Sequence, residues 1–251
     1  MSSWRRTARS GLKAAARRIG LLEPPANYDV HLYETISRLR RWTDQDVIFD
    51  VGANDGRTIL RLDKHLPPAR IFAFEPVAST FATLQERTSH LSNVRYFPLA
   101  LGAEPGEQTM YINESAAVNS LRPDWGSCQH TETIQMTTLD QFVEQNGVER
   151  VHLLKIDAEG HDLEVLKGGA ETLSRSKVDM IEVEAGFSAP GRPQPSLEEF
   201  RILLADYGYH LYGIYNQCRG RRTSRRDGGQ APEILVYCDA LFINVQSDLN
   251  A

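Results

Sequence analysis

The sequence contains few cysteines and no long apolar run. Its 251 residues include three cysteines, none in a C-x-x-C pair, which argues against a disulfide framework and against a cysteine zinc site. A reducing cytosol fits this usage best. No uninterrupted apolar stretch reaches the roughly 18 residues of a membrane helix, and no apolar segment follows the first basic residues, so neither a membrane span nor a secretory signal is expected. The net charge of −5 argues against a chain built as a whole to hold nucleic acid.

The first 22 residues lack acidic side chains and carry six basic ones. Apolar residues from Trp4 to Leu22 recur at helical spacing, which predicts a basic amphipathic helix. This helix either rests on an anionic membrane surface or packs as a solvated extension of the folded body. Pro24 and Pro25 end it. We therefore expect residues 1–30 to form a helical extension and linker, residues 31–251 to form the folded domain, and the protein to be cytoplasmic, with peripheral membrane contact as an option.

From residue 31 onward, apolar strands alternate with helical patterns of about ten residues, which is typical of parallel βαβ units. The last two strands have no helix between them and are expected to pair antiparallel. The fold class is therefore α/β, with a Rossmann-like, seven-stranded, mostly parallel sheet of the kind found in methyltransferases that use S-adenosylmethionine. The expected strands are 47–51, 70–75, 93–98, 151–157, 178–184, 209–215 and 235–245, and the expected helices are 31–42, 57–66, 77–87, 138–146, 163–173 and 196–207.

A β-rich insertion, about residues 101–137, interrupts this alternation. Residues 107–113 and 133–137 alternate like exposed strands, and the polar loop between them is too long to be a mere connector. Such loops often act as lids or binding loops. We expect Asn119 and Ser120 in this loop to bind substrate.

The stretch V-I-F-D-V-G-A-N-D-G-R at 47–57 predicts a ligand loop after the first strand. It lacks the middle glycine of a dinucleotide G-x-G-x-x-G loop and the lysine of a phosphate-binding loop. Asp50 and Asp55 flank the loop and would repel a phosphate by several kcal/mol at ~4 Å, whereas they would favour a sulfonium or ammonium group. Glu75 follows Gly52 by 23 residues at the end of the second strand, where an acid can bind ribose hydroxyls.

Six short motifs in this order resemble the FkbM-type family of S-adenosylmethionine-dependent O-methyltransferases. They are D-V-G-A-N-D-G-R (50–57), F-E-P (74–76), A-L-G (100–102), T-L-D (138–140), L-K-I-D-A-E-G-H-D (154–162) and I-E-V-E (181–184). The resemblance implies methylation of a hydroxyl on a sugar, polyketide, or lipid or polysaccharide head group. The cofactor-binding residues expected from the loop and these motifs are Asp50, Gly52, Asn54, Asp55, Gly56, Glu75, Pro76 and Ala100.

The segment 155–162 is the densest cluster of chemistry-bearing side chains. Asp157 and Glu159 are candidates for orienting the acceptor or taking its proton, with Lys155 as a charge partner and His161 as an alternative base. The Lys155 and Asp157 side chains could equally form only a buried ion pair. A magnesium site built from Asp157, Glu159, Glu182 and Glu184 is conceivable, but strand-end acids are more often hydrogen-bonded, so no metal ligand is expected.

Arginines gather between the last two strands, and these include Arg219, Arg221 and Arg222. Arginine side chains bind carboxylates, phosphates and sulfates through paired hydrogen bonds, so this loop favours an acidic acceptor. Glu184 is a further substrate-binding candidate. A solvated basic hairpin would have the same sequence. Two other functions remain open: a nicotinamide-dinucleotide enzyme that modifies sugars, and a non-catalytic protein bound to a membrane surface. The sequence leaves open the acceptor, the base and the oligomeric state.

Overall fold

The computed structural model describes residues 30–114, 119–124, 128–187, 194–221 and 233–247. The expected basic helix at 1–22 and Arg222 lie outside these residues. In the described part of the chain, no helix is both long and apolar enough to cross a membrane.

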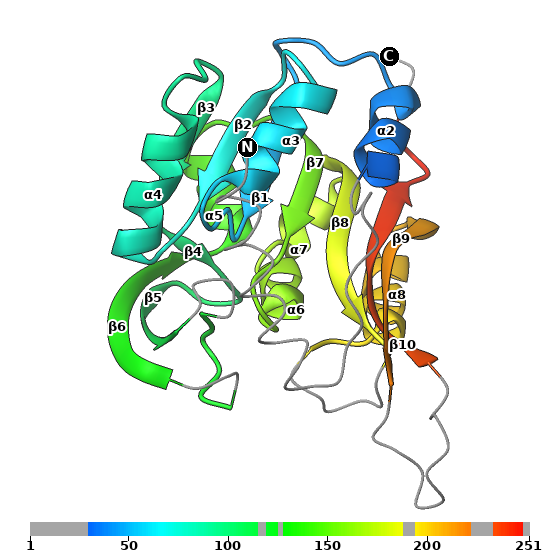
Figure 1. Ribbon diagram of the computed structural model, residues 1–251. Helices are drawn as coiled ribbons and strands as arrows, with labels where there is room; N and C mark the ends of the chain where they lie inside the picture. Colours follow the sequence, from blue (N-terminus) through cyan, green and yellow to red (C-terminus); the bar gives the residue numbers. More distant parts are fainter. Residues whose placement is uncertain (1–29, 115–118, 125–127, 188–193, 222–232, 248–251) are drawn as a thin grey trace, which may run out of the picture.

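A seven-stranded sheet with helices on both faces forms the body of the protein (Figure 1). Its strand order is β3-β2-β1-β7-β8-β10-β9, and β10 runs antiparallel to both of its neighbours, so the predicted fold class is confirmed. The strands are β1 (Val47–Val51), β2 (Arg70–Phe74), β3 (Val94–Phe97), β7 (Val151–Ile156), β8 (Val178–Gly186), β9 (Tyr209–Arg221) and β10 (Glu233–Asn244). The helices are α2 (Val30–Leu39), α3 (Arg57–His65), α4 (Ala78–Thr88), α5 (Leu139–Gln145), α6 (Asp162–Lys167), α7 (Ala170–Ser174) and α8 (Leu197–Ala205).

The side chains of β1 show how the sheet separates two apolar cores. Phe49 points to one face and packs with α5 to α8, whereas Ile48 points to the other face and packs with α2, α3 and α4. This alternation follows from the two-residue period of a strand. The sheet is therefore the middle layer of a three-layer α/β/α arrangement.

The insertion forms a small sheet of its own. Its strands are β4 (Ala100–Leu101), β5 (Gly106–Asn113) and β6 (Cys128–Thr137), in the order β4-β6-β5. Met110, Ile112, Ile134 and Met136 pack with Val77 of the main domain. The two strands expected in this region are therefore confirmed, and the small sheet lies against the start of α4.

The helix expected at 163–173 is instead two short helices, α6 and α7, separated by Gly168 and Gly169. A Cβ atom on Gly168 would lie 1.9 Å from the carbonyl oxygen of Gly102, and one on Gly169 would lie 2.6 Å from the Leu139 side chain. These positions have no side chain, so two neighbouring segments can pack directly against their backbone.

The far strand β9 extends six residues beyond the predicted end at Tyr215. Cys218, Arg219 and Arg221 continue to pair with β10, through register shifts that bend the pair. The arginine-rich segment therefore begins within a strand rather than after it.

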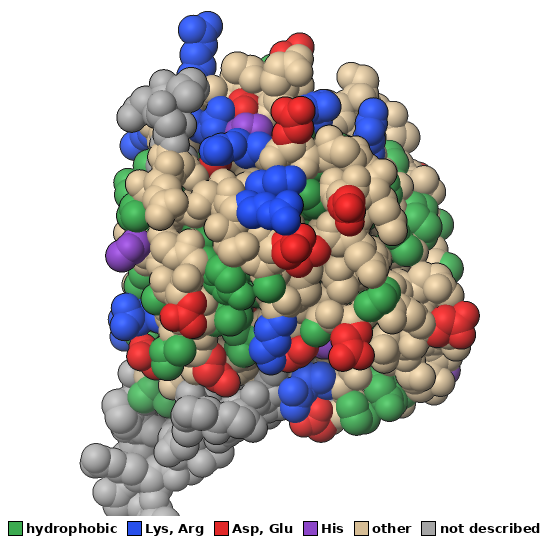
Figure 2. All heavy atoms as spheres, turned by 180° about the vertical axis from the view of Figure 1, so that it is seen from behind, with side chains coloured by type: hydrophobic (Ala, Val, Ile, Leu, Met, Phe, Trp, Pro, Cys, Tyr) green, Lys and Arg blue, Asp and Glu red, His purple; other side chains and the backbone are tan. Residues whose placement is uncertain are grey.

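Charges of both signs are mixed on the face opposite to the view of Figure 1. Figure 2 shows acidic and basic side chains intermingled there, with apolar side chains between them. This described face carries no extended basic surface of the kind that nucleic acid requires.

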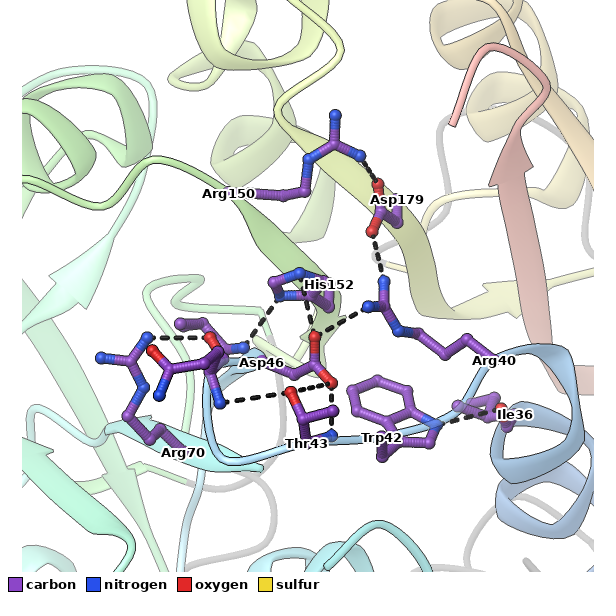
Figure 3. Close-up of polar contacts among 11 residues, drawn as sticks. Ile36, Arg40, Trp42, Thr43, Asp46, Arg70, Arg150, His152 and Asp179 are labelled. Carbon is purple, nitrogen blue, oxygen red and sulfur yellow. Dashed lines mark hydrogen bonds and ion pairs between the residues drawn. The ribbon is translucent and has the colours of Figure 1, made fainter. Parts of the chain in front are cut away.

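A buried ion network ties the amino ends of the central strands together (Figure 3). Asp46 accepts a hydrogen bond from Arg40 Nη2 at 2.8 Å and lies 3.1 Å from His152 Nε2. Asp179, which is fully buried, accepts from Arg40 Nη1 at 3.0 Å and from Arg150 Nη1 at 2.5 Å. Arg40 therefore connects the segment before β1 to the start of β8, at the edge of the sheet opposite to the carboxyl ends.

We expect Asp179→Ala to lower the free energy of unfolding by about 3–5 kcal/mol, because it leaves the buried Arg40 guanidinium with half of its ion pairing. Urea unfolding followed by circular dichroism measures the loss. Arg150→Ala is the matched control, since the Arg150 side chain is 43% exposed and its removal should cost only about 1 kcal/mol or less. Equal losses in the two variants would contradict the assignment of Asp179 and Arg40 as the strong pair.

Candidate functional site

A cavity of about 630 Å³, counting the part open to solvent, lies at the carboxyl ends of β1, β2 and β7. This position is where open parallel sheets bind ligands. We call it the main cavity. Its lining residues are Val51, Gly52, Asn54, Phe74, Glu75, Pro76, Val77, Leu99, Ala100, Leu101, Met110, Asn119, Leu121, Asp157, Ala158, Glu159 and His161.

Gly52 allows the loop after β1 to cross the end of β7. Its φ is +78°, and a Cβ atom there would lie 2.0 Å from the carbonyl oxygen of Asp157. Its N–H donates to the carbonyl of Phe74 at 3.0 Å. The protein's own backbone therefore packs against this glycine, and the ends of β1, β2 and β7 meet at one point.

Glu75 is buried between this loop and the start of α4. Its carboxylate accepts from the N–H of Asn54 at 3.0 Å and from the N–H of Val77 at 2.9 Å. Burial raises the pKa of Glu75 to about 7, although the two backbone hydrogen bonds oppose the shift. Each carboxylate oxygen can accept a further hydrogen bond, so Glu75 can still take two hydroxyl groups from the cavity.

Lys155 joins two carboxylates at the floor of the site. Its Nζ lies 3.1 Å from Asp50 Oδ1 and 3.4 Å from Asp157 Oδ2. Burial alone would lower the pKa of Lys155, but the carboxylates of Asp50, Asp157 and Glu182 raise it above its ordinary value. Lys155 is therefore a permanent cation, and it holds the partly exposed Asp157 carboxylate at the cavity wall.

The turn at 158–161 is shaped by Asp162 and by the insertion. The Asp162 carboxylate accepts from the N–H groups of Ala158 and Gly160 at 3.3 and 3.2 Å. The Ser120 hydroxyl donates to the carbonyl of Glu159 at 2.7 Å. Ser120, expected to bind substrate, thus bonds to the turn that carries two candidate catalytic side chains, and its contact with substrate stays a prediction.

His161 lies in the main cavity against Gly102 of the insertion. Its Nε2 is buried and has no hydrogen-bond partner among the described residues. Burial lowers the pKa of His161, so the ring is neutral near pH 7 and one of its nitrogens can accept a hydrogen bond.

Three of the expected cofactor residues do not line the main cavity. Asp50 is fully buried behind it as the partner of Lys155. Asp55 pairs with Arg57 and Arg87 at 2.8 and 2.5 Å. A Cβ atom on Gly56 would lie 2.9 Å from the Thr88 side chain, so this glycine serves the packing of the loop on α4. The sequence does not reveal Arg87 and Thr88 as neighbours of this loop, because they lie about 30 residues further along the chain.

The residues expected to bind the acceptor do not lie together. Asn119 lies in the main cavity with Glu75, whereas Glu184 lies in a second cavity together with Lys155 and Asp157. Arg219 is exposed on β9, Arg221 has no described side chain, and Arg222 is outside the described residues. The sequence did not single out Met110 and Leu121, which give the main cavity an apolar wall. Their place in the insertion hides this role, because only the small sheet brings them to the cavity.

Among the described residues, no group of three or more His, Cys, Asp or Glu is arranged to hold a metal ion.

The FkbM methyltransferase domain matches residues 50–211, about two thirds of the chain. The hexuronic acid methyltransferase AglP of Haloferax volcanii is 31% identical over 144 residues, covering 57% of this chain and 58% of the relative. Methyltransferase 1 of Beauveria bassiana is 32% identical over 146 residues, covering 50% and 59%. The 2-O-methyltransferase NoeI of Sinorhizobium fredii is 25% identical over 173 residues, covering 63% and 70%. The chain thus spans less than two thirds of the length of the first two relatives.

Among solved structures, the crystal structure of methyltransferase FkbM from Methylobacillus flagellatus aligns with a TM-score of 0.51 at 18% identity. The alignment covers 84% of this chain and 47% of that one. At 18% sequence identity, this structural similarity supports the fold alone.

Proposed function

Because this chain belongs to the FkbM methyltransferase family, we propose that it transfers the methyl group of S-adenosylmethionine to a hydroxyl group of a sugar-type acceptor. The observation that carries the proposal is the main cavity itself, which places a buried carboxylate, an apolar wall and a second carboxylate around one space. The printed names of two relatives, a hexuronic acid methyltransferase and a 2-O-methyltransferase, support a sugar-type acceptor.

The main cavity fits a nucleoside that carries no phosphate. Glu75 offers two carboxylate oxygens to ribose hydroxyls, and Leu99, Met110 and Leu121 offer an apolar surface to an adenine ring. Glu75 and Asp157 both face this space, and a carboxylate near a phosphate costs several kcal/mol at about 4 Å. The same charges favour a sulfonium. The side-chain amide of Asn119, which lines the same cavity, can form a hydrogen bond to the adenine edge.

Asp157 is the residue best suited to remove the proton of the acceptor. Bound S-adenosylmethionine supplies an electrophilic methyl group, so the protein has to align an acceptor hydroxyl and remove its proton. Asp157 is the one candidate base that lines both cavities. Lys155 fixes its carboxylate at 3.4 Å, while Glu159 and His161 line only the main cavity. We therefore assign proton removal to Asp157.

Binding of S-adenosylhomocysteine should weaken about tenfold from pH 8 to pH 6, because Glu75, with a pKa of about 7, loses its charge over this range and with it part of its capacity to accept from ribose. Calorimetric titration at several pH values measures the effect. In Glu75→Gln the affinity should be lower and nearly independent of pH. A pH dependence that survives unchanged in Glu75→Gln would assign it to another group.

The proposed activity is tested with labelled S-adenosylmethionine and a panel of sugars, glycolipids and polysaccharides. The result expected is label in a base-stable ether on a sugar hydroxyl, and label on none of the acceptors would contradict the proposal. An acidic acceptor held by Arg219, Arg221 and Arg222 stays a prediction of the sequence, as does membrane contact through residues 1–22. Co-sedimentation with anionic liposomes, with and without residues 1–22, tests the latter.

A further inference from the structure

A second cavity of about 400 Å³, counting its open part, lies on the other side of Asp157. It is formed at the carboxyl ends of β7 and β8, beside β10, and is covered by residues of α2 and α3. Its lining residues are Tyr33, Thr58, Arg61, Lys155, Ile156, Asp157, Glu182, Glu184 and Asp239. Eight of these nine have polar side chains, in contrast to the apolar wall of the main cavity.

Asp157 is the only residue in the described part of the chain that both cavities share. Methyl transfer requires donor and acceptor to meet in line at one point. If the nucleoside occupies the main cavity, an acceptor in the second cavity meets it at Asp157, next to a group that can take its proton.

Carboxylates outnumber cations in the second cavity. Asp157, Glu182, Glu184 and Asp239 face it, against Lys155 and Arg61. Lys155 is already paired with Asp50, a further carboxylate behind the wall. A carboxylate or phosphate entering this space would meet several kcal/mol of repulsion at about 4 Å, while hydroxyl or ammonium donors would not.

The acids of β8 and β10 are held in place by neighbouring donors. Glu184 and Asp239 stand opposite each other in the antiparallel ladder. The amide of Gln194 donates to Glu184, and the amide of Asn216 donates to Asp239 at 2.6 Å. The Tyr33 hydroxyl donates to Glu182 at 3.2 Å. Because a carboxylate oxygen accepts more than one hydrogen bond, these fixed acids form a rigid set of acceptors for hydroxyl groups.

Burial, together with the nearby carboxylates of Asp157 and Asp239, raises the pKa of Glu184 well above its ordinary value. When Glu184 is protonated, the repulsion across the ladder is lower, and Asp157, Glu182 and Asp239 still outnumber Lys155 and Arg61 in the cavity. A protonated Glu184 would also give the cavity a donor that can meet a hydroxyl oxygen.

We propose that the second cavity holds the reacting sugar ring of the acceptor, and that this ring is uncharged or carries an amino group rather than a carboxylate or phosphate. The proposal rests on the proposed methyltransferase function and names its acceptor site. The acceptor oxygen forms a bond to the methyl carbon as the carbon–sulfur bond breaks, the electron pair stays on sulfur, and the hydroxyl proton passes to Asp157. Anionic groups elsewhere on the acceptor remain free to lie outside this cavity.

The test uses three matched probes with labelled S-adenosylmethionine: methyl β-glucoside, methyl β-glucosaminide and methyl β-glucuronide. We expect kcat/KM for the glucoside or the glucosaminide to exceed that for the glucuronide at least tenfold. A glucuronide that reacts equally well or better would overturn the assignment. Failure of all three probes, while S-adenosylhomocysteine still binds, would overturn it as well. Failure of S-adenosylhomocysteine to bind would instead contradict the proposed function.

Two substitutions test whether the second cavity binds the acceptor and determines its selectivity against the glucuronide. Thr58→Trp fills it and should reduce kcat/KM at least tenfold, with the Kd of S-adenosylhomocysteine unchanged within twofold. The matched control is Thr83→Trp on the exposed face of α4, which should leave both values unchanged. Asp239→Asn removes one negative charge. It should lower the ratio of kcat/KM for the glucoside to kcat/KM for the glucuronide at least threefold. If Thr58→Trp behaves like the control, or if Asp239→Asn leaves the ratio unaltered, the acceptor lies elsewhere.

Discussion

Asp157→Asn should lower kcat for methyl transfer by about 10²–10⁴-fold, the usual contribution of a positioned general base. The asparagine keeps the shape of the side chain and its place next to Lys155, but it cannot accept the acceptor's proton. Because Asp157 contributes only one part of the main cavity, the Kd of S-adenosylhomocysteine should change by less than about fivefold. Single-turnover methyl transfer and calorimetry measure the two effects separately.

Glu159→Gln is the matched comparison for this result. Glu159 lines the same cavity two residues away and lies outside the second cavity, so its loss should reduce kcat by less than about tenfold. A larger loss in Glu159→Gln than in Asp157→Asn would assign the base to Glu159. The same comparison with His161→Gln tests the remaining candidate.

Lys155→Met should lower the free energy of unfolding by about 3–5 kcal/mol, because it leaves the fully buried Asp50 carboxylate without its cation. This is a large fraction of the roughly 5–15 kcal/mol that stabilises an ordinary domain. Methionine has nearly the length of lysine, so the loss reports the charge rather than the packing. Urea unfolding measures it.

The double variant Asp50→Asn with Lys155→Met separates the ion pair from other effects. The two groups lie opposite each other in the β1–β7 register and 3.1 Å apart. Their removal together should cost less than the sum of the single losses by at least about 1 kcal/mol. Additive losses would mean that Lys155 acts mainly through Asp157 and Glu182 rather than through Asp50.

The sequence predicts the sheet well because its central strands are short apolar runs separated by helical patterns. β1 is buried along its whole length, as expected of a parallel strand with helices on both faces, and the acids at the strand ends meet at one edge of the sheet. This is why Glu75 and Asp157, which are 82 residues apart, could be assigned to one site before the structure was known.

The two aspartates of the loop after β1 do not face the main cavity as the sequence predicts. Asp50 and Asp55 were expected to face the ligand, but Lys155 neutralises the first, and Arg57 and Arg87 neutralise the second. The carboxylates that line the main cavity, and that we propose exclude phosphate, are those of Glu75 and Asp157. The sequence could not reveal this, because such pairing depends on side chains that only the packing of α4 and β7 brings within reach.

The insertion is predicted from the sequence only as two strands and a polar loop, without its place on the domain. Its polar loop suggested contact with the acceptor, yet Asn119, Met110 and Leu121 line the main cavity, and Ser120 holds the turn after β7. A short separate sheet has no periodic signal that tells which face of the domain it will cover. Of the acids that line the second cavity, the sequence indicated Asp157, Glu182 and Glu184, whereas Asp239 joins them only through the fold, as does the basic Arg61.

The most direct test of the proposed function is calorimetric titration of the full chain with S-adenosylhomocysteine and, in parallel, with NAD. We expect one molecule of S-adenosylhomocysteine bound per chain, with binding weakened in Glu75→Gln, and no detectable heat from NAD. Binding of NAD without binding of S-adenosylhomocysteine would contradict it.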